Sequence, residues 1–255
     1  MQLFTRSARQ WTARPLAEED VRAFAAARAT TGVGAVLAHD SYLLNLAAPD
    51  AALHARSVRD LIAELERCER LGIPYLVSHP GAHCGAGEDE GLRCAARGLG
   101  EALRACRGFA ATVALENTAG QGTQIGYRFA HLGRLLADTP DGDRLRVCID
   151  TQHAFAAGYD LRTAAGYTSA MAELAQVVGM ARVVAFHLND AKRGLGTRVD
   201  RHEHIGRGEL GVRAFRRLLR DDRFAGLPMC IETPKGDDLA EDVENLRVLR
   251  GLLRG

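Results

Sequence analysis

The sequence predicts an α/β fold made of parallel βα units. Short apolar runs rich in Val and Ile alternate along the chain with amphipathic stretches of helical spacing. The runs are continuously apolar, which is typical of strands covered on both faces. A strand, a helix and a further strand in succession form a parallel βα unit. At 255 residues the chain is long enough for one large α/β barrel or two smaller domains.

Six apolar runs are predicted as strands. In chain order they are VGAVLAH (33–39), IPYLVSH (73–79), TVALE (112–116), RVCID (146–150), VVAFH (183–187) and LPMCIE (227–232), and MQLFT at the N-terminus is a seventh candidate. Amphipathic stretches predict helices over residues 57–72, 91–108, 166–182 and 239–253. No low-complexity linker or change of composition marks a second domain, so we expect a single domain over residues 1–255.

The composition is that of an ordinary soluble protein. Hydrophobic residues make up 47% and charged residues 25%, and 33 basic residues nearly balance 32 acidic ones. Net charge therefore gives no argument for a nucleic-acid partner, and any such footprint must be local. No apolar run approaches the roughly 20 residues of a membrane span. The six cysteines form no CxxC pair, and the start lacks the apolar segment of a signal peptide, so we expect a cytoplasmic protein with reduced thiols.

Every one of the six apolar runs ends on a side chain that can bind a metal ion. These residues are His39, His79, Glu116, Asp150, His187 and Glu232. In a parallel barrel all strand C-termini open onto one face, so the six groups would converge in one pocket. One histidine at a strand end is more often a hydrogen-bonded core residue. Six imidazoles and carboxylates packed together are costly without a cation, which favours a metal centre.

Two local motifs extend this ligand set. In DTQH, His153 follows Asp150 by three residues, and in DRH, Asp200 and His202 alternate, so an extended loop would project both to one side. Nitrogen and oxygen ligands without thiolate suit Zn²⁺, with Mn²⁺ or Fe²⁺ as alternatives. The nine candidates exceed the needs of one ion and suit two or three. Multi-metal sites commonly activate water for displacement at phosphorus.

The loop after His187 carries basic residues and glycines beside its ligands. Its basic side chains, which would bind phosphate groups, are Lys192, Arg193, Arg198, Arg201 and Arg207. Its glycines, which would let the loop fold tightly, are Gly194, Gly196, Gly206 and Gly208. Among the other histidines, His83 and His204 either orient neighbouring ligands or lie at the surface. His54 and His131 fall in helical patterns and are expected to be surface or packing residues.

Six segments occur along the chain in the order AHDSYLLNL, VSHPGAH, LENTAGQG, CIDTQHAFAAGYDLRT, HLNDAKRGLGTRVDRHEHIGRGELG and IETPK. Together they resemble the successive motifs of endonuclease IV, the zinc-dependent apurinic/apyrimidinic endonuclease family. The resemblance runs from about Leu3 to the last predicted strand. It implies a TIM-type (β/α)8 barrel and a DNA-repair enzyme. That enzyme would hydrolyse the phosphodiester 5′ to an abasic site, leaving a 3′-hydroxyl and a 5′-deoxyribose phosphate.

The resemblance also implies a three-zinc centre, with Mn²⁺ as an alternative at one position. One ion would take His39, His79 and Glu116. A second would share Glu116 as a bridge and add Asp150, His187 and Glu232, and the third would take His153, Asp200 and His202. A hydroxide held between the first two ions would attack the phosphorus, so the bridging Glu116 is the expected catalytic residue.

For DNA, the resemblance implies that Arg9 and Tyr42 enter the duplex and hold the abasic nucleotide outside it. Base flipping needs side chains that fill the vacated space in the duplex, because unstacking a base costs a few kcal/mol. The expected partner is double-stranded DNA with abasic or 3′-blocked sites, bound by a monomer, and no membrane partner is expected. Two features depart from the family. Gln152 stands where cysteine is common, and TRSARQW differs from the commoner TKNxRxW.

The family normally begins with a further strand and helix. The chain is therefore expected to lack the first βα unit of the barrel, on the order of 30 residues. We expect the native protein to start upstream of Met1, and the 255-residue form to be less stable or less active, because unpaired strand edges are liabilities.

Two other functions stay open from the sequence. Metal-dependent sugar isomerases and epimerases also place Glu, Asp and His at barrel strand ends. They need one or two ions, which would leave Asp200 and His202 unused. A damaged-DNA binding protein with a purely structural zinc centre is the non-catalytic alternative. Nicking of an abasic duplex would distinguish the nuclease from both.

Overall fold

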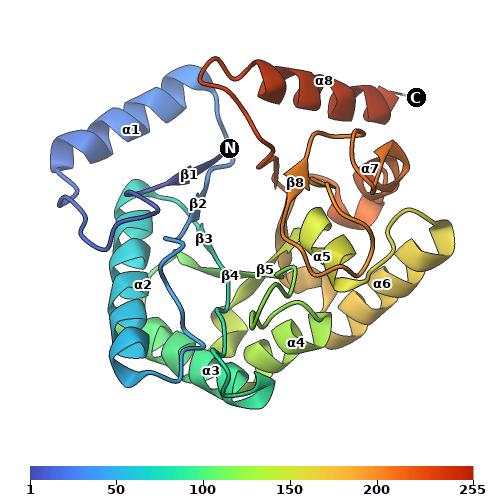
Figure 1. The fold of residues 1–255 in the computed structure, drawn as a ribbon. Helices are drawn as coiled ribbons and strands as arrows, with labels where there is room; N and C mark the ends of the chain where they lie inside the picture. The colour runs from blue at the N-terminus through green and yellow to red at the C-terminus, as the bar shows by residue number, and fades with distance from the viewer. Residues whose placement is uncertain (255) are drawn as a thin grey trace. The chain divides into compact units, whose positions relative to one another are not determined.

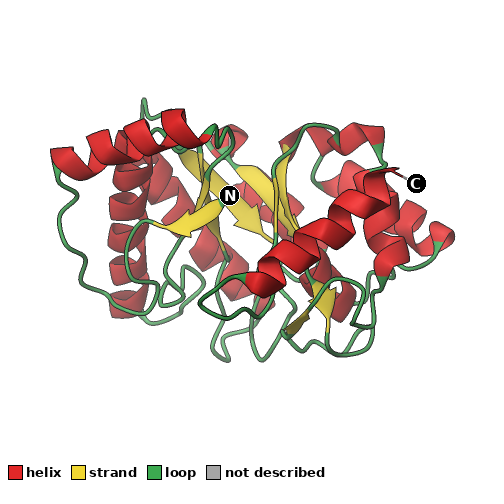
Figure 2. Cartoon of the chain, turned by 90° about the horizontal axis from the view of Figure 1, so that it is seen from above, coloured by secondary structure: helices red, strands yellow, loops and turns green. Residues whose placement is uncertain are grey.

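The computed structural model describes residues 1–254, in which strands and helices alternate as the sequence predicts (Figure 1). The main strands are β1 (Gln2–Phe4), β2 (Leu37–His39), β3 (Tyr75–Ser78), β4 (Thr112–Glu116), β5 (Arg146–Asp150), β6 (Val183–His187) and β9 (Met229–Cys230), in the order β1-β2-β3-β4-β5-β6-β9. Every strand pairing that we describe within this sheet is parallel. The strands are short and most of the regular structure is helical (Figure 2).

Eight α-helices lie within residues 1–254. They are α1 (Glu18–Thr31), α2 (Ala51–Leu71), α3 (Glu88–Ala105), α4 (Phe129–Asp138), α5 (Thr151–Ala157), α6 (Ala164–Val177), α7 (Val212–Leu219) and α8 (Ala240–Arg254). Three short 3-10 turns cover Gly142–Arg144, Met180–Arg182 and Asp222–Phe224. No helix within residues 1–254 has both the length and the apolar character needed to cross a membrane.

The chain divides into two compact units. Unit 1 comprises Met1–Glu116 and Arg134–Val147, and unit 2 comprises Asn117–Gly133 and the chain from Cys148 onward. Strand β5 and helix α4 each contain residues of both units.

Unit 1 contains a parallel ladder of β1 to β4 in chain order. Phe4 is paired with His39, and His39 with Val77, so the carboxyl ends of these strands lie at one edge. Helix α2 begins at its cap Asp50, whose side chain accepts the backbone N–H of Leu53 at 2.7 Å. Its buried side chains recur at helical spacing and include Leu61 and Leu65.

Unit 2 contains β6, whose five residues are all buried, paired in parallel with β9. A second ladder, antiparallel, joins β7 (Asp190–Ala191) to β8 (His202–Glu203). This ladder closes the chain between residues 192 and 201 into a loop. Helix α5 follows β5 without an intervening turn, because the Asp150 carboxylate accepts the backbone N–H of His153 at 2.8 Å and caps the helix.

Three predicted strands were too long. The run 33–39 forms a strand only at its end, and β3 and β9 each begin directly after a proline, Pro74 and Pro228, which has no N–H for a ladder. At the other ends of β3 and β9, His79 and Glu232 lie just beyond the strands rather than within them. Glu232 lies outside β9 because its backbone N–H donates to Oδ1 of the Asn189 side chain at 2.7 Å instead of to a neighbouring strand.

The predicted helices correspond to α2, α3, α6 and α8, with shifted bounds. Helices α1, α4, α5 and α7 were not predicted. Helix α1 contains no buried residue, so it has no strong apolar stripe to read. Helices α5 and α7 have seven and eight residues, which is too short for a periodic pattern to stand out.

Candidate metal centre

Three predicted ligands come together in unit 1, and we name them the first cluster: His39, His79 and Glu116. Glu116 Oε2 lies 3.3 Å from His39 Nε2 and 3.1 Å from His79 Nε2. The three ligand atoms lie within 4.8 Å of one another. The parallel ladder explains this meeting. His39 ends β2 and Glu116 ends β4, the two strands on either side of β3, and His79 directly follows β3.

A buried carboxyl group supports His39 from behind. The Nδ1 of His39 lies 2.9 Å from the backbone oxygen of Asp40 and 3.4 Å from its Oδ1. Burial raises the pKa of Asp40 to about 6, an effect that the neighbouring His39 opposes. The hydroxyl of Ser78 donates to the same carboxyl group at 2.5 Å. Asp40 was not predicted from the sequence, although it directly follows a predicted ligand.

Unit 2 holds the other six predicted ligands in two adjoining groups. The second cluster consists of Asp150, His187 and Glu232, whose ligand atoms lie within 4.8 Å of one another. In it, His187 Nδ1 lies 3.1 Å from Glu232 Oε2 and 3.8 Å from Asp150 Oδ2. Asp150 and His187 are completely buried, at the ends of β5 and β6.

The third cluster consists of His153, Asp200 and His202. Asp200 Oδ1 lies 3.3 Å from His153 Nε2 and 3.5 Å from His202 Nε2. Asp150 adjoins it, with Oδ2 3.7 Å from His202 Nε2. As the alternation in the DRH motif predicts, Asp200 and His202 face the same group, although only His202 lies in a strand.

The donor atoms of these clusters fit metal ions. His153 Nδ1 lies 2.9 Å from the backbone oxygen of Asn117, and His202 Nδ1 lies 3.0 Å from that of Glu232, so both rings present Nε2 to carboxylates. Within the described residues, the buried Nε2 of His202 makes no hydrogen bond. A lone pair facing a carboxylate is unfavourable unless a cation lies between them. Zinc bonds of about 2.0–2.1 Å in a tetrahedral site separate ligand atoms by about 3.3 Å, close to the distances above.

Two asparagines connect the unit 2 ligands to one another. Asn117 exchanges two hydrogen bonds with the backbone of Asp150, at 2.8 and 3.1 Å. Asn189 donates to Asp150 Oδ2 at 2.5 Å and accepts the backbone N–H of Glu232. Both asparagines are completely buried. Neither was predicted from the sequence, where the available signal was their position, one residue after Glu116 and two after His187.

The buried Asp190, which was not predicted from the sequence either, organises the chain from residue 188 to residue 211, which we call the long loop. Its carboxylate accepts backbone N–H groups of residues 191, 206, 208, 210 and 211. Gly208 is required here, because a Cβ at this position would lie 2.5 Å from the backbone oxygen of Ala191 and 2.6 Å from Asp190 Oδ1. The carboxylate thus gathers the part of the loop that follows His202.

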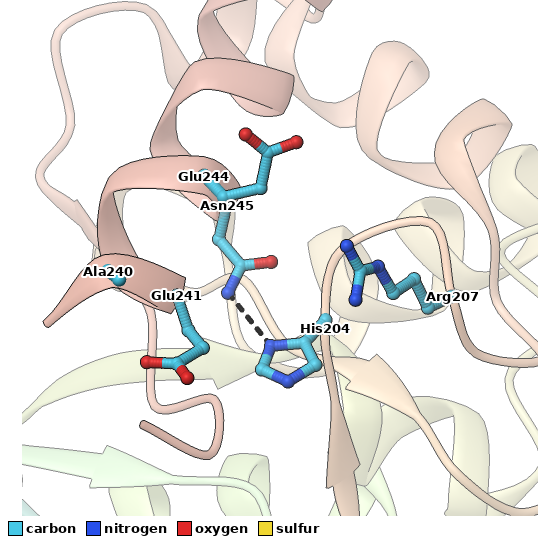
Figure 3. A pocket seen from close by; sticks show the side chains of 6 residues that line it. All are labelled: His204, Arg207, Ala240, Glu241, Glu244 and Asn245. Carbon is cyan, nitrogen blue, oxygen red and sulfur yellow. Dashed lines mark hydrogen bonds between the residues drawn. The ribbon is translucent and has the colours of Figure 1, made fainter. Parts of the chain in front are cut away.

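Neither His83 nor His204 belongs to a ligand group among the described residues. His83 Nδ1 accepts the backbone N–H groups of Gly85 and Gly87 and shapes its own loop. His204 Nδ1 lies 3.1 Å from Nδ2 of Asn245 (Figure 3). Together with Arg207, Glu241 and other residues, it lines a pocket of about 230 Å³ on the surface of unit 2.

His54 and His131 are buried packing residues, which settles the alternative left open by the sequence. The Nδ1 of His54 lies 3.0 Å from the backbone oxygen of Leu46. His131 accepts the backbone N–H of Gly126 and contacts the ring of Tyr127 edge-on.

The two predicted DNA-reading residues lie on connected loops of unit 1. Tyr42 is 60% exposed, and its ring contacts those of Phe4 and His39. The backbone N–H of Tyr42 donates to Ala8 at 3.1 Å, next to the exposed Arg9. The predicted phosphate-binding side chains of the unit 2 loop are also exposed: Lys192, Arg193, Arg198, Arg201 and Arg207.

Comparison with known proteins defines the class of fold. A family model described as xylose isomerase-like TIM barrel matches residues 1–251. The crystal structure of endonuclease IV from Thermus thermophilus has a TM-score of 0.85 and 38% identity, covering 99% of this chain and 88% of that one. A D-tagatose 3-epimerase-like protein has a TM-score of 0.74 at 18% identity, covering 93% of this chain and 84% of that one, a likeness of fold alone.

Two sequence relatives narrow the class further. A probable endonuclease 4 of Chloroflexus aurantiacus is 53% identical over 255 residues, covering 100% of this chain and 90% of that protein. A probable endonuclease 4 of Geobacter sulfurreducens is 45% identical over 254 residues, covering 100% of this chain and 86% of that protein. The chain therefore belongs to the endonuclease IV family, and the predicted TIM-type α/β fold is confirmed.

Proposed function

We propose that the protein is a DNA-repair endonuclease that hydrolyses the phosphodiester 5′ to abasic sites, leaving a 3′-hydroxyl and a 5′-deoxyribose phosphate. Its relatives named endonuclease 4 match along the full chain. The observation that carries the proposal is the third cluster, in which His153 and His202 both turn Nε2 toward the Asp200 carboxylate. Such a donor set is built to hold a cation.

We assign three Zn²⁺ ions to the nine residues, with Mn²⁺ as an alternative at one position. The first cluster would hold one ion, the second cluster with Glu116 a second, and the third cluster a third. Its covalent link to a residue that contacts the second cluster supports Glu116 as the bridging ligand. It is bonded to Asn117, whose side chain fixes the backbone of Asp150. When bound, such ions activate water and neutralise charge on phosphoryl oxygens.

The protein's own residues would hold these ligands in one protonation state. His39, His153 and His202 each place Nδ1 against a backbone oxygen at 2.9 to 3.0 Å, which fixes the tautomer and keeps the Nε2 lone pair available. The complete burial of Glu116 and Asp150 excludes water from their other sides. The clusters are thereby preorganised rather than assembled on binding.

Substrate binding would use the exposed residues. The basic loop side chains suit phosphate groups, which supply most of the affinity of proteins for DNA. We propose that Arg9 and Tyr42 enter the duplex beside an abasic nucleotide, and that a single chain binds double-stranded DNA with abasic or 3′-blocked sites. The segment before Trp11 is well anchored for this role. Arg6 binds the buried Glu64 at 2.7 Å and the Trp11 backbone oxygen at 3.0 Å.

The alternatives are less well supported. Sugar epimerases and an epimerase-like protein share the fold at 13–18% identity, whereas proteins named endonuclease 4 reach 54%. An epimerase would also leave the third cluster without use. A purely structural zinc centre does not require ligands that are partly exposed, as Asp200 and Glu232 are.

A nicking assay tests the proposal. Zinc-loaded protein should cut a duplex with one abasic-site analogue on its 5′ side, and a polymerase should extend the new 3′ end. An undamaged duplex of the same sequence should stay intact. Glu116→Ala should abolish cutting. An intact abasic duplex at stoichiometric protein, or conversion of a ketose sugar instead, would reject the endonuclease assignment.

A further inference from the structure

One peptide group in the long loop of unit 2 is bound from both sides by glutamine side chains. The backbone oxygen of Val199 accepts a hydrogen bond from Nε2 of Gln152 at 2.9 Å. The backbone N–H of Asp200 donates to Oε1 of Gln121 at 3.0 Å. These two groups belong to the same peptide bond, so the two glutamines grip one rigid plane.

This grip determines where Asp200 lies. In a trans peptide the C=O and N–H point in opposite directions, so binding both fixes the rotation of the plane. The rotation sets ψ of Val199 and φ of Asp200, and thereby the direction in which the Asp200 side chain leaves the backbone. Without it, the peptide could turn and carry the carboxylate away from His153 and His202.

The residues before this peptide are anchored too. The N–H of Arg198 donates to the backbone oxygen of Ala156 at 2.9 Å, and that of Gly196 to the oxygen of Phe155 at 3.1 Å. Arg198 has a φ of +53°, which is unfavourable for a residue with a side chain. Its guanidinium lies 4.3 Å from the ring centre of Tyr127. The loop is therefore held in a conformation that it would not adopt unaided.

Burial of the Gln152 side chain destabilises the folded protein, which indicates that this residue positions the loop rather than stabilises the fold. It is completely buried, and within the described residues its Oε1 makes no hydrogen bond. An unpaired buried acceptor is destabilising. Within the described residues, its side chain makes one hydrogen bond, the one to Val199.

We propose that Gln152 and Gln121 form an amide clamp, a pair of positioning residues that presets Asp200 as a ligand of the third cluster. The proposal rests on the function proposed above and names the residues that tune one of its metal sites. Losing a residue that orients a metal ligand typically costs about 10–100-fold in metal affinity. The clamp should act on the third cluster alone.

Zinc release separates this role from a general structural one. Zinc-loaded protein is mixed with excess chromophoric chelator, and the release phases are recorded for wild type, Gln152→Met and Gln121→Met. The His202→Ala variant identifies the phase that belongs to the third cluster, because that phase should be missing. Both Met variants should accelerate this phase about tenfold and leave the others unchanged, with the larger effect for the buried Gln152.

Gln124→Met is the matched control. Gln124 lies in the same loop as Gln121 and also has a buried Oε1 without a hydrogen bond among the described residues. The peptide 199–200 is bound by Gln152 and Gln121 and not by Gln124, so the Gln124 variant should release zinc at the wild-type rate. In metal-free protein, hydrogen exchange over residues 192–201 should be faster in the two clamp variants and unchanged in the control.

Three outcomes would overturn the clamp. Release and exchange at wild-type rates in both clamp variants would exclude it. Acceleration of every phase together with a lower melting temperature would make Gln152 a structural residue only. A wild-type protein that binds no zinc would remove the proposed metal centre as well. In contrast, zinc-binding wild type with unaffected variants would reject the clamp alone.

Discussion

At the scale of single residues, the candidate metal centre depends on how its imidazoles are oriented. His39, His153 and His202 each direct Nδ1 at a backbone oxygen, and the three carbonyls belong to Asp40, Asn117 and Glu232. The backbone is a reliable partner for this purpose, because a carbonyl oxygen cannot change its protonation state. The Nε2 atoms are therefore left to face carboxylates, which is the arrangement that a divalent cation requires.

Metal content tests the third cluster. We expect about three zinc ions per chain in the wild-type protein and the loss of at least one in Asp200→Ala or His202→Ala, since each removes a ligand. Elemental analysis of protein purified without chelator measures this. His204→Ala is a suitable control, because His204 belongs to no ligand group of the described residues and should leave the content unchanged. One ion or none in folded wild-type protein would contradict the assignment.

DNA binding should depend on residues that bind no metal. Tyr42→Ala should weaken binding to an abasic duplex about tenfold or more, because aromatic stacking against bases is worth roughly 1–3 kcal/mol. Arg9→Ala should weaken it as well, because it removes a cationic side chain that would enter the duplex. Binding to undamaged duplex should change much less, and the zinc content should stay at the wild-type value. Fluorescence anisotropy with both duplexes provides the comparison. Loss of zinc, or equal losses on the two duplexes, would argue against these roles.

At the scale of elements, the structure of the long loop depends on one buried carboxylate. Asp190 binds five backbone N–H groups, four of them from residues 206 to 211. The ladder of β7 and β8 joins the same loop at its base. The Asp190 carboxylate binds the chain after β8, and the amide clamp binds the peptide 199–200 just before β8. Asp200 and His202 are therefore held without being part of a larger sheet.

A glycine pair tests this organisation. Gly208→Ala should lower the free energy of unfolding by roughly 1–3 kcal/mol, as overpacking usually does, because the added Cβ would meet a backbone oxygen at 2.5 Å. It should also release zinc faster from the third cluster. Gly194→Ala, whose Cβ would meet only a methyl group at 4.0 Å, should do neither. Urea denaturation measures the free energy of unfolding of both variants, and equal values would show that the loop adapts to the added Cβ.

At the scale of the whole molecule, stability should be linked to metal. Both compact units contain ligand clusters in which carboxylates are buried, so removal of metal takes away the cations that would balance these buried charges. Chelation should therefore lower the melting temperature, and added Zn²⁺ should restore it. A ligand at 100 times its Kd stabilises the folded state by about 2.7 kcal/mol. Equal melting temperatures with and without metal would exclude a linked centre.

The sequence by itself predicted the alternation of strands and helices and all nine residues that the structure gathers into clusters. Both depend on local features. Hydrophobic periodicity reports burial over a few neighbouring residues, and a polar residue at the end of an apolar run can be recognised from the local sequence. In a parallel sheet that residue lies at the common edge, so local pattern and topology together place it. The single domain over residues 1–255 stays a prediction.

The tertiary structure alone decided which groups support those ligands. Asn117, Asn189 and Asp190 look like ordinary loop residues in the sequence, yet each is completely buried and hydrogen-bonded within a cluster or its loop. The partners of the amide clamp lie 47 and 79 positions apart along the chain. No short-range pattern encodes a hydrogen bond across such a distance, because its geometry exists only after the strands and the loop have packed. Sequence thus determined what the site contains, and packing determined how it is held.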